Sequence, residues 1–144
     1  MPEDPALTIS DDAIGQALRS VSALIFDVPG EDDPASREAI CLHFDSCVIT
    51  LRALTDTSEL SVRDTALAMP DDPEFNGCYS IADISGDHVF RHLTGKTLRN
   101  WWSLTNDAGY QDGFMVSFSS RDAVCIVAMN NQISILTISG EQCS

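Results

Sequence analysis

Two histidines are spaced so that they could share a metal ion. In His88-Val-Phe-Arg-His92 the imidazoles are four residues apart, which would place them on one face of a helix. No glutamate follows the first histidine as the zinc-protease motif requires, and a third ligand would have to come from Asp83, Asp87 or Cys78. We therefore expect no metal and no other cofactor, and keep His88 and His92 only as weak metal candidates.

Nucleophilic catalysis would need a thiol or hydroxyl beside a base. Cys47 lies four residues from His43, and Cys78 lies between a glycine and a tyrosine, but no catalytic signature surrounds either thiol. Phosphate-binding and calcium-binding loop motifs are also missing from the sequence. We predict that the protein is not an enzyme. The alternative of a small metal-dependent or thiol hydrolase, using His88, His92 and nearby carboxylates, stays open.

The aromatic residues point instead to recognition of a partner. Trp101 and Trp102 are adjacent on a predicted strand, so their side chains must lie on opposite faces, and one of them faces solvent unless another layer covers it. An exposed tryptophan with acidic neighbours is typical of a protein-interface hot spot. The alternative, in which both faces of the sheet are covered, stays open. The predicted partner-binding residues are Trp101, Trp102, Tyr110, Asp112, Asp32 and Asp33.

Charge narrows the class of partner. The 144 residues include 22 acidic and 8 basic side chains, so the formal net charge is −14. This balance excludes an ordinary nucleic-acid binder and disfavours docking on an anionic membrane, because both need clustered basic residues. A hydrophobic content of 44% indicates a folded protein. We expect a basic protein partner, while the bias of a salt-adapted or high-GC proteome is the other explanation of the charge.

Alternation of apolar and polar residues predicts most of the strands that carry these side chains. Residues 11–26 could form one amphipathic helix, with Ile14, Leu18, Val21 and Ile25 on one stripe, but their match with the strand at 98–105 favours a strand at 18–27. The predicted strands are residues 18–27, 37–44, 47–54, 59–63, 98–105, 111–118, 123–129 and 132–138. Tight turns join 37–44 to 47–54 and join the last three strands to one another, and connections this short cannot cross over, so we expect antiparallel pairing. The last strand, 132–138, is apolar and could be an open edge through which two chains form a homodimer.

The two halves of the chain resemble each other in four blocks of the same order. Residues 15–24 match 95–104, 37–44 match 111–118, 48–53 match 124–129, and 60–62 match 133–135. Any two antiparallel meanders share alternation, so coincidence is the competing explanation. A repeat predicts a short helix before each meander, near 10–17, where Ser10 is the expected N-cap, and near 84–93.

The expected fold is therefore α+β and mainly antiparallel β, with two pseudo-repeats of a short helix followed by a four-stranded meander. One domain spans 1–144, with the first repeat unit at about 8–63, a linker at 64–77 and the second unit at about 78–139. The amino-terminal residues are acidic where a secretory signal would be basic, and the odd set of five cysteines suits reduced thiols. We expect a cytoplasmic protein.

A stretch of the second unit resembles a family of small bacterial domains of unknown function. The shared pattern consists of a Gly-Lys pair, a strand tryptophan and an Asn-x-x-Gly-Tyr-x-Asp turn, carried here by Gly95, Lys96, Trp101, Asn106, Gly109, Tyr110 and Asp112. This resemblance implies no known activity. By size and charge the chain is also loosely similar to acidic bacterial immunity proteins. Together these observations predict a non-enzymatic acidic binding protein that neutralises a basic toxin or nucleic-acid enzyme, as an immunity or inhibitor protein does.

Overall fold

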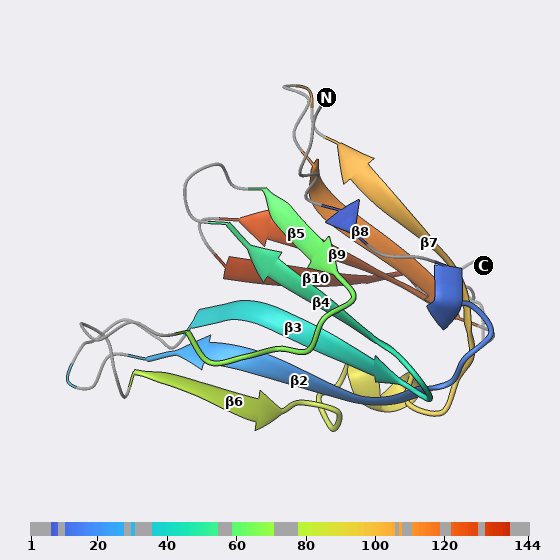
Figure 1. Cartoon of the computed structure of the whole chain (residues 1–144), viewed down its shortest axis with the longest axis horizontal. Coiled ribbons are helices and arrows are strands. Elements are labelled where there is room, and N and C mark those ends of the chain that lie inside the picture. The colour runs from blue at the N-terminus through green and yellow to red at the C-terminus, as the bar shows by residue number, and fades with distance from the viewer. Residues whose placement is uncertain are drawn as a thin grey trace.

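The chain folds into two β-sheets that face each other (Figure 1). The computed structural model describes residues 7–8, 11–27, 30, 36–54, 59–70, 78–105, 107, 111–118, 122–129 and 132–138. The large sheet has the strand order β1-β5-β4-β3-β2-β6, and the small sheet has the order β10-β9-β8-β7. The strands are β1 (Leu7–Thr8), β2 (Leu18–Phe26), β3 (Ser36–Phe44), β4 (Val48–Ala53), β5 (Leu60–Arg63), β6 (Tyr79–Asp83), β7 (Leu98–Thr105), β8 (Gln111–Phe118), β9 (Ala123–Met129) and β10 (Gln132–Ile138).

The α+β prediction is wrong, because the described residues contain no α-helix. Where a helix was expected near 10–17, only the 3-10 turn η1 (Asp11–Ala13) forms; near 84–93, only the 3-10 turn η3 (Phe90–His92) forms. Gly15 has a φ of +93°, a left-handed conformation that ends any helix at that point. All strand pairs are antiparallel except β1 with β5.

The eight predicted strands are confirmed as β2–β5 and β7–β10, and each set forms a meander of consecutive neighbours. Two strands were not predicted. The short β1 pairs with β5, and β6 pairs along β2 from Ser22 with Asp83 to Phe26 with Tyr79. β6 therefore extends the large sheet at the edge opposite β1.

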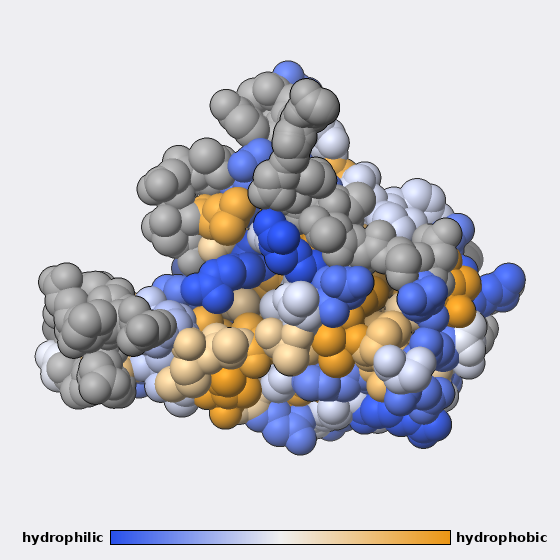
Figure 2. All heavy atoms as spheres, viewed as in Figure 1, coloured by the Kyte–Doolittle hydropathy of each residue, from blue (hydrophilic) through white to orange (hydrophobic). Residues whose placement is uncertain are grey.

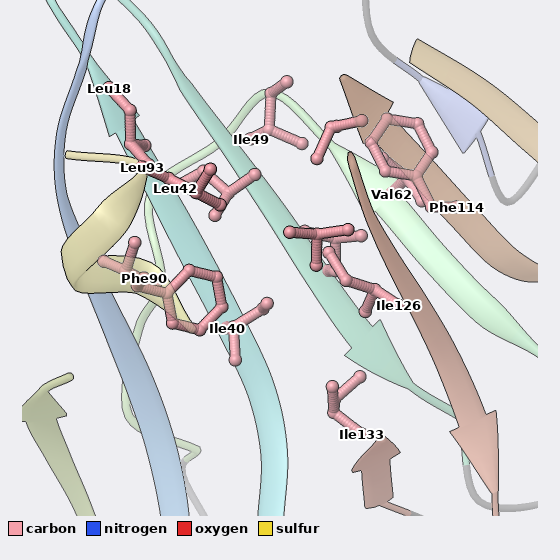
Figure 3. Packing of buried hydrophobic residues seen from close by; sticks show 14 of the residues in the cluster. Leu18, Ile40, Leu42, Ile49, Val62, Phe90, Leu93, Phe114, Ile126 and Ile133 are labelled. Carbon is pink, nitrogen blue, oxygen red and sulfur yellow. The ribbon is translucent and has the colours of Figure 1, made fainter. Parts of the chain in front are cut away.

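The hydrophobic core lies between the sheets (Figure 3). Inward-facing residues of the small sheet, such as Phe114 and Ile126, pack toward Ile49 and Val62 of the large sheet. The remaining inner face of the large sheet is covered by Phe90 of η3 and by Leu93 after it, both of which belong to the same buried cluster. Each meander thus buries one face in a common core, and its other face is left outside it.

The two meanders meet at a joint built from matching positions 80 residues apart. The residues Gly15 and Gly95 both have left-handed backbone, with φ of +93° and +90°. The Gly15 N–H donates to the Leu98 carbonyl, and the Gly95 N–H donates to the Leu18 carbonyl. The pairing of β2 with β3 shifts register after Leu18 and after Leu24; the pairing of β7 with β8 shifts after Leu98 and after Leu104.

Strand pairing corrects the third block of the sequence alignment by one residue. Ile49 pairs with Leu42 on β3, and Val124 occupies the corresponding place opposite Val116 on β8. Val48, which the alignment had matched with Val124, therefore has the opposite orientation. A shift of one residue moves a side chain to the other face of its sheet.

Candidate functional site

An apolar row crosses the outer face of the small sheet. Trp102 of β7 pairs with Met115 of β8, Met115 pairs with Cys125 of β9, and Cys125 pairs with Leu136 of β10. Trp102 is 42% exposed and Leu136 is 58% exposed. Two large hydrophobic side chains thus stand in solvent at opposite ends of one continuous row.

A second apolar group lies beside this row, where Gly113 separates two aliphatic side chains. A Cβ atom added to Gly113 would lie 3.1 Å from Cδ1 of Leu104 and 3.4 Å from Cγ1 of Val127. These two side chains therefore close over the glycine. Leu104, Gly113 and Val127 are consecutive partners in the strand pairing, in the position next to the row that contains Trp102 and Met115.

The regularly paired, described positions on this face have no charged side chain, whereas Arg99 and Asp112 lie at the two irregularities of the β7–β8 pairing. The described outward positions, omitting bulge residues, are Asn100, Trp102, Leu104, Gly113, Met115, Ser117, Ala123, Cys125, Val127, Gln132, Ser134 and Leu136. Asp112 lies at the irregularity where β8 meets the end of β7. Burial raises the pKa of the Cys125 thiol, and the negative charge of Asp112 raises it further.

Trp101 points to the opposite side of β7, as adjacency predicted. Its ring stacks on Phe114 with centroids 5.5 Å apart, and it packs against the core. Its indole Nε1 is buried without a hydrogen-bond partner among the described residues. Trp102 is therefore the tryptophan available to a partner. Of the other predicted binding residues, Asp112 is partly exposed, whereas Tyr110, Asp32 and Asp33 lie outside the described residues.

The two candidate metal ligands are close but unsupported by a third. The His88 and His92 rings meet edge to face with centroids 5.7 Å apart, and both side chains are exposed. No group of three or more His, Cys, Asp and Glu side chains within the described ranges is arranged to hold a metal ion. His43 lies elsewhere, on β3, where its Nε2 is 3.0 Å from the Ser22 hydroxyl.

An acidic hollow of about 550 Å³ lies at the turn between β3 and β4, and sequence reasoning did not predict it. Asp12, Asp45, Asp64 and Cys47 are among its lining residues. Burial raises the pKa of the Cys47 thiol, and the charges of Asp12 and Asp64 raise it further. A higher pKa disfavours the thiolate, so this environment does not suit Cys47 as a nucleophile.

These features define a class: an antiparallel β domain of two facing sheets, one of which has an exposed apolar row across its outer face. Within the described part of the chain, no helix has the length and apolar character needed to span a membrane. The chain belongs to a family of unknown function, DUF6334, whose model matches residues 1–141. No curated protein and no solved structure matches the chain. The expected membership of a family of small domains of unknown function is confirmed; the shared turn pattern and the likeness to immunity proteins stay predictions.

Proposed function

We propose that the protein is a non-enzymatic binding protein that docks a protein partner on the outer face of the small sheet. The observation that carries this proposal is the exposed row from Trp102 to Leu136, in which none of the four paired positions is charged. Exposed apolar patches of this kind mark interaction sites in soluble proteins. Tryptophan is also the side chain most often found at the energetic centre of an interface.

The corresponding face of the large sheet supports the proposal, because the chain itself covers that face. Ser22, Cys41, Thr50 and Arg63 form its matching row. The segment 64–70, here called the crossing segment, leaves β5 and runs in front of β4 and β3 in Figure 1. Figure 2 shows the same side of the molecule, where hydrophilic and hydrophobic residues both reach the surface. The Thr50 hydroxyl donates to the Thr65 carbonyl, and a backbone hydrogen bond joins Leu67 to the Cys41 thiol.

Apolar side chains on the covered outer face of the large sheet are shielded from solvent. Leu24, Ala39 and Cys41 alternate with core residues and lie on the outer face of the large sheet, yet all three are fully buried. On the small sheet, Trp102 and Leu136 have no such cover from any described element. A partner segment lying across β7–β10 would supply the layer that the crossing segment supplies on the large sheet.

The charge distribution favours a basic partner with an apolar centre. Asp107 and Asp112 lie near one end of the small sheet, and Asp122 lies at the turn before β9. A net charge of −14 speeds encounter with a cationic protein, while the uncharged centre of the face avoids burying an unpaired charge. A basic toxin or nucleic-acid enzyme held inactive by direct binding fits this description.

Trp102→Ala tests the proposal, with Ile81→Ala as the control. Ile81 is 43% exposed on β6, so it matches Trp102 in exposure but lies on the other sheet. A buried tryptophan removes up to about 250 Å² from water. The exposed 42% of Trp102 thus corresponds to roughly 100 Å², or about 2.5 kcal/mol at ~25 cal/mol per Å². Loss of that contact should weaken binding by about 70-fold.

The assay is biolayer interferometry against a panel of purified basic nuclease and toxin domains at low and high salt. We expect at least one panel member to bind, to lose affinity on Trp102→Ala but not on Ile81→Ala, and to bind more weakly at high salt. Two results would contradict the proposal: no binding by any basic domain at low salt, or equal binding by the Trp102→Ala variant.

A further inference from the structure

A small pocket on the large sheet brings two arginines together in an otherwise acidic protein. The pocket has a volume of about 200 Å³ and lies between strands β4 and β5 and the crossing segment. Its lining residues are Thr50, Arg52, Ser61, Arg63, Thr65, Ala66, Leu67 and Ala68. None of these residues is acidic, although the chain carries 22 acidic side chains.

Strand pairing places the two guanidinium groups on one face and close to each other. Arg52 lies opposite Ser61, and Arg63 lies opposite Thr50. The arginines are therefore diagonal neighbours, a relation that separates Cα atoms by roughly 7–8 Å, within reach of long side chains. Both are partly buried, so their positive charges lie partly out of water.

Hydrogen bonds hold the walls of the pocket in place. The Nε of Arg63 donates to the Ser61 hydroxyl at 3.2 Å, which orients its guanidinium group. The bonds from Thr50 to Thr65 and from Leu67 to Cys41 tie the crossing segment to the sheet. These bonds hold the crossing segment and the Arg63 side chain in place around the pocket.

The meander of the small sheet has no arginine at the two positions that match Arg52 and Arg63. By the strand registers, the matching positions on the small sheet are Val127 for Arg52 and Leu136 for Arg63. The same backbone arrangement thus carries two cations on one sheet and two aliphatic side chains on the other. The charge of Arg52 also acts on Glu38: burial raises the pKa of the Glu38 carboxyl, and Arg52 lowers it. Glu38 does not line the pocket.

We propose that this pocket binds the phosphate group of a small molecule between Arg52 and Arg63. Guanidinium groups match phosphate oxygens in a bidentate geometry, and the Ser61 and Thr65 hydroxyls add two further hydrogen-bond donors. The volume admits a phosphate group but is below the range of pockets that enclose a whole drug-sized ligand. The rest of such a molecule would stay in solvent. This site is on the opposite sheet from the proposed docking face and is independent of it.

The test is an NMR titration of the ¹⁵N-labelled full chain with inorganic phosphate, O-phosphoserine and acetate at constant pH and ionic strength. We expect saturable shifts of amides in residues 50–52 and 61–68 with both phosphate compounds, and at least tenfold weaker binding of acetate. Shifts with O-phosphoserine alone would identify a phosphate ester as the ligand, and shifts with both would show that the phosphate group suffices.

Arg52→Gln should weaken phosphate binding about tenfold, because one charge-assisted pair is lost. Arg52→Lys keeps the charge without the planar fork and should give an intermediate loss. Arg99→Gln, on the exposed part of β7, is the matched control and should bind as the wild type does. The amide spectrum of each variant reports whether it is folded. The proposal is overturned if neither inorganic phosphate nor O-phosphoserine gives a saturable shift, if acetate binds as tightly as the phosphate compounds, or if folded Arg52→Gln and Arg52→Lys both retain wild-type affinity.

Discussion

Replacing either joint glycine by alanine should destabilise the protein by a similar amount. Gly15 and Gly95 have φ of +93° and +90°, and nothing lies within 4 Å of a Cβ atom built on either. Steric crowding is therefore excluded, and the cost is that of placing an L-residue in left-handed backbone. That cost is about 1–2 kcal/mol. For a chain of this length it corresponds to a melting temperature lower by roughly 2–8 °C.

Gly86→Ala is the matched control, because Gly86 also has open space around its Cβ position but no left-handed φ. Alanine there should be neutral or stabilise by about 0.4–1 kcal/mol, since it reduces the freedom of the unfolded chain. The assay is urea denaturation followed by tryptophan fluorescence, with the slope of the transition as a check on two-state behaviour. If Gly15→Ala and Gly95→Ala were as stable as Gly86→Ala, or differed from each other by more than about 1 kcal/mol, the matched-joint reasoning would fail.

Two further predictions concern the core and an ion pair. Phe114 is fully buried and stacks on Trp101, so Phe114→Ala should lower the free energy of unfolding by about 3–5 kcal/mol, and Phe114→Leu should cost clearly less; urea midpoints measure both. The hydrogen bond from Arg19 lowers the pKa of Asp45 in the folded protein below its ordinary value of 3.8. The Arg19–Asp45 pair therefore stabilises the fold above pH 3.8, and this stabilisation is lost as the pH falls through the pKa of Asp45 in the folded state. Arg19→Gln should therefore lower stability slightly at pH 7 and flatten its dependence on pH below 4; an unchanged acid transition would refute the assignment.

Most strands could be predicted because the pattern that indicates them lies within the strand itself. The two expected helices were wrong because contacts with residues distant in sequence decide the structure there. Alternation and turn residues mark β3 and β4 directly in the sequence. Residues 11–26 carry an apolar stripe compatible with a helix; only their match with residues 95–104 favours a strand at 18–27, and the pairing of β2 with both β3 and β6 confirms that strand. The left-handed backbone at Gly15 likewise depends on its bond to Leu98, which is distant in sequence.

The candidate face could be predicted only in part, for a similar reason. The adjacency of Trp101 and Trp102 predicts opposite faces from strand geometry alone. Which tryptophan faces solvent depends on the register shift after Leu98, and the neighbours Met115, Cys125 and Leu136 are brought together by three separate pairings. No pattern within one strand contains that information. The same holds for Arg52 and Arg63, which strand pairing and the crossing segment bring to one pocket.

The chemical difference between the two outer faces is the strongest reason to assign them different tasks. An antiparallel sheet whose outer face meets only water is usually polar on that face. In this protein the chain crosses the polar row from Ser22 to Arg63, whereas no described element covers the apolar row from Trp102 to Leu136. Exposed apolar area favours self-association, and a net charge of −14 opposes it by mutual repulsion between copies. The same charge that keeps like copies apart attracts a basic partner, so the apolar face and the acidity together favour association with a different, cationic protein.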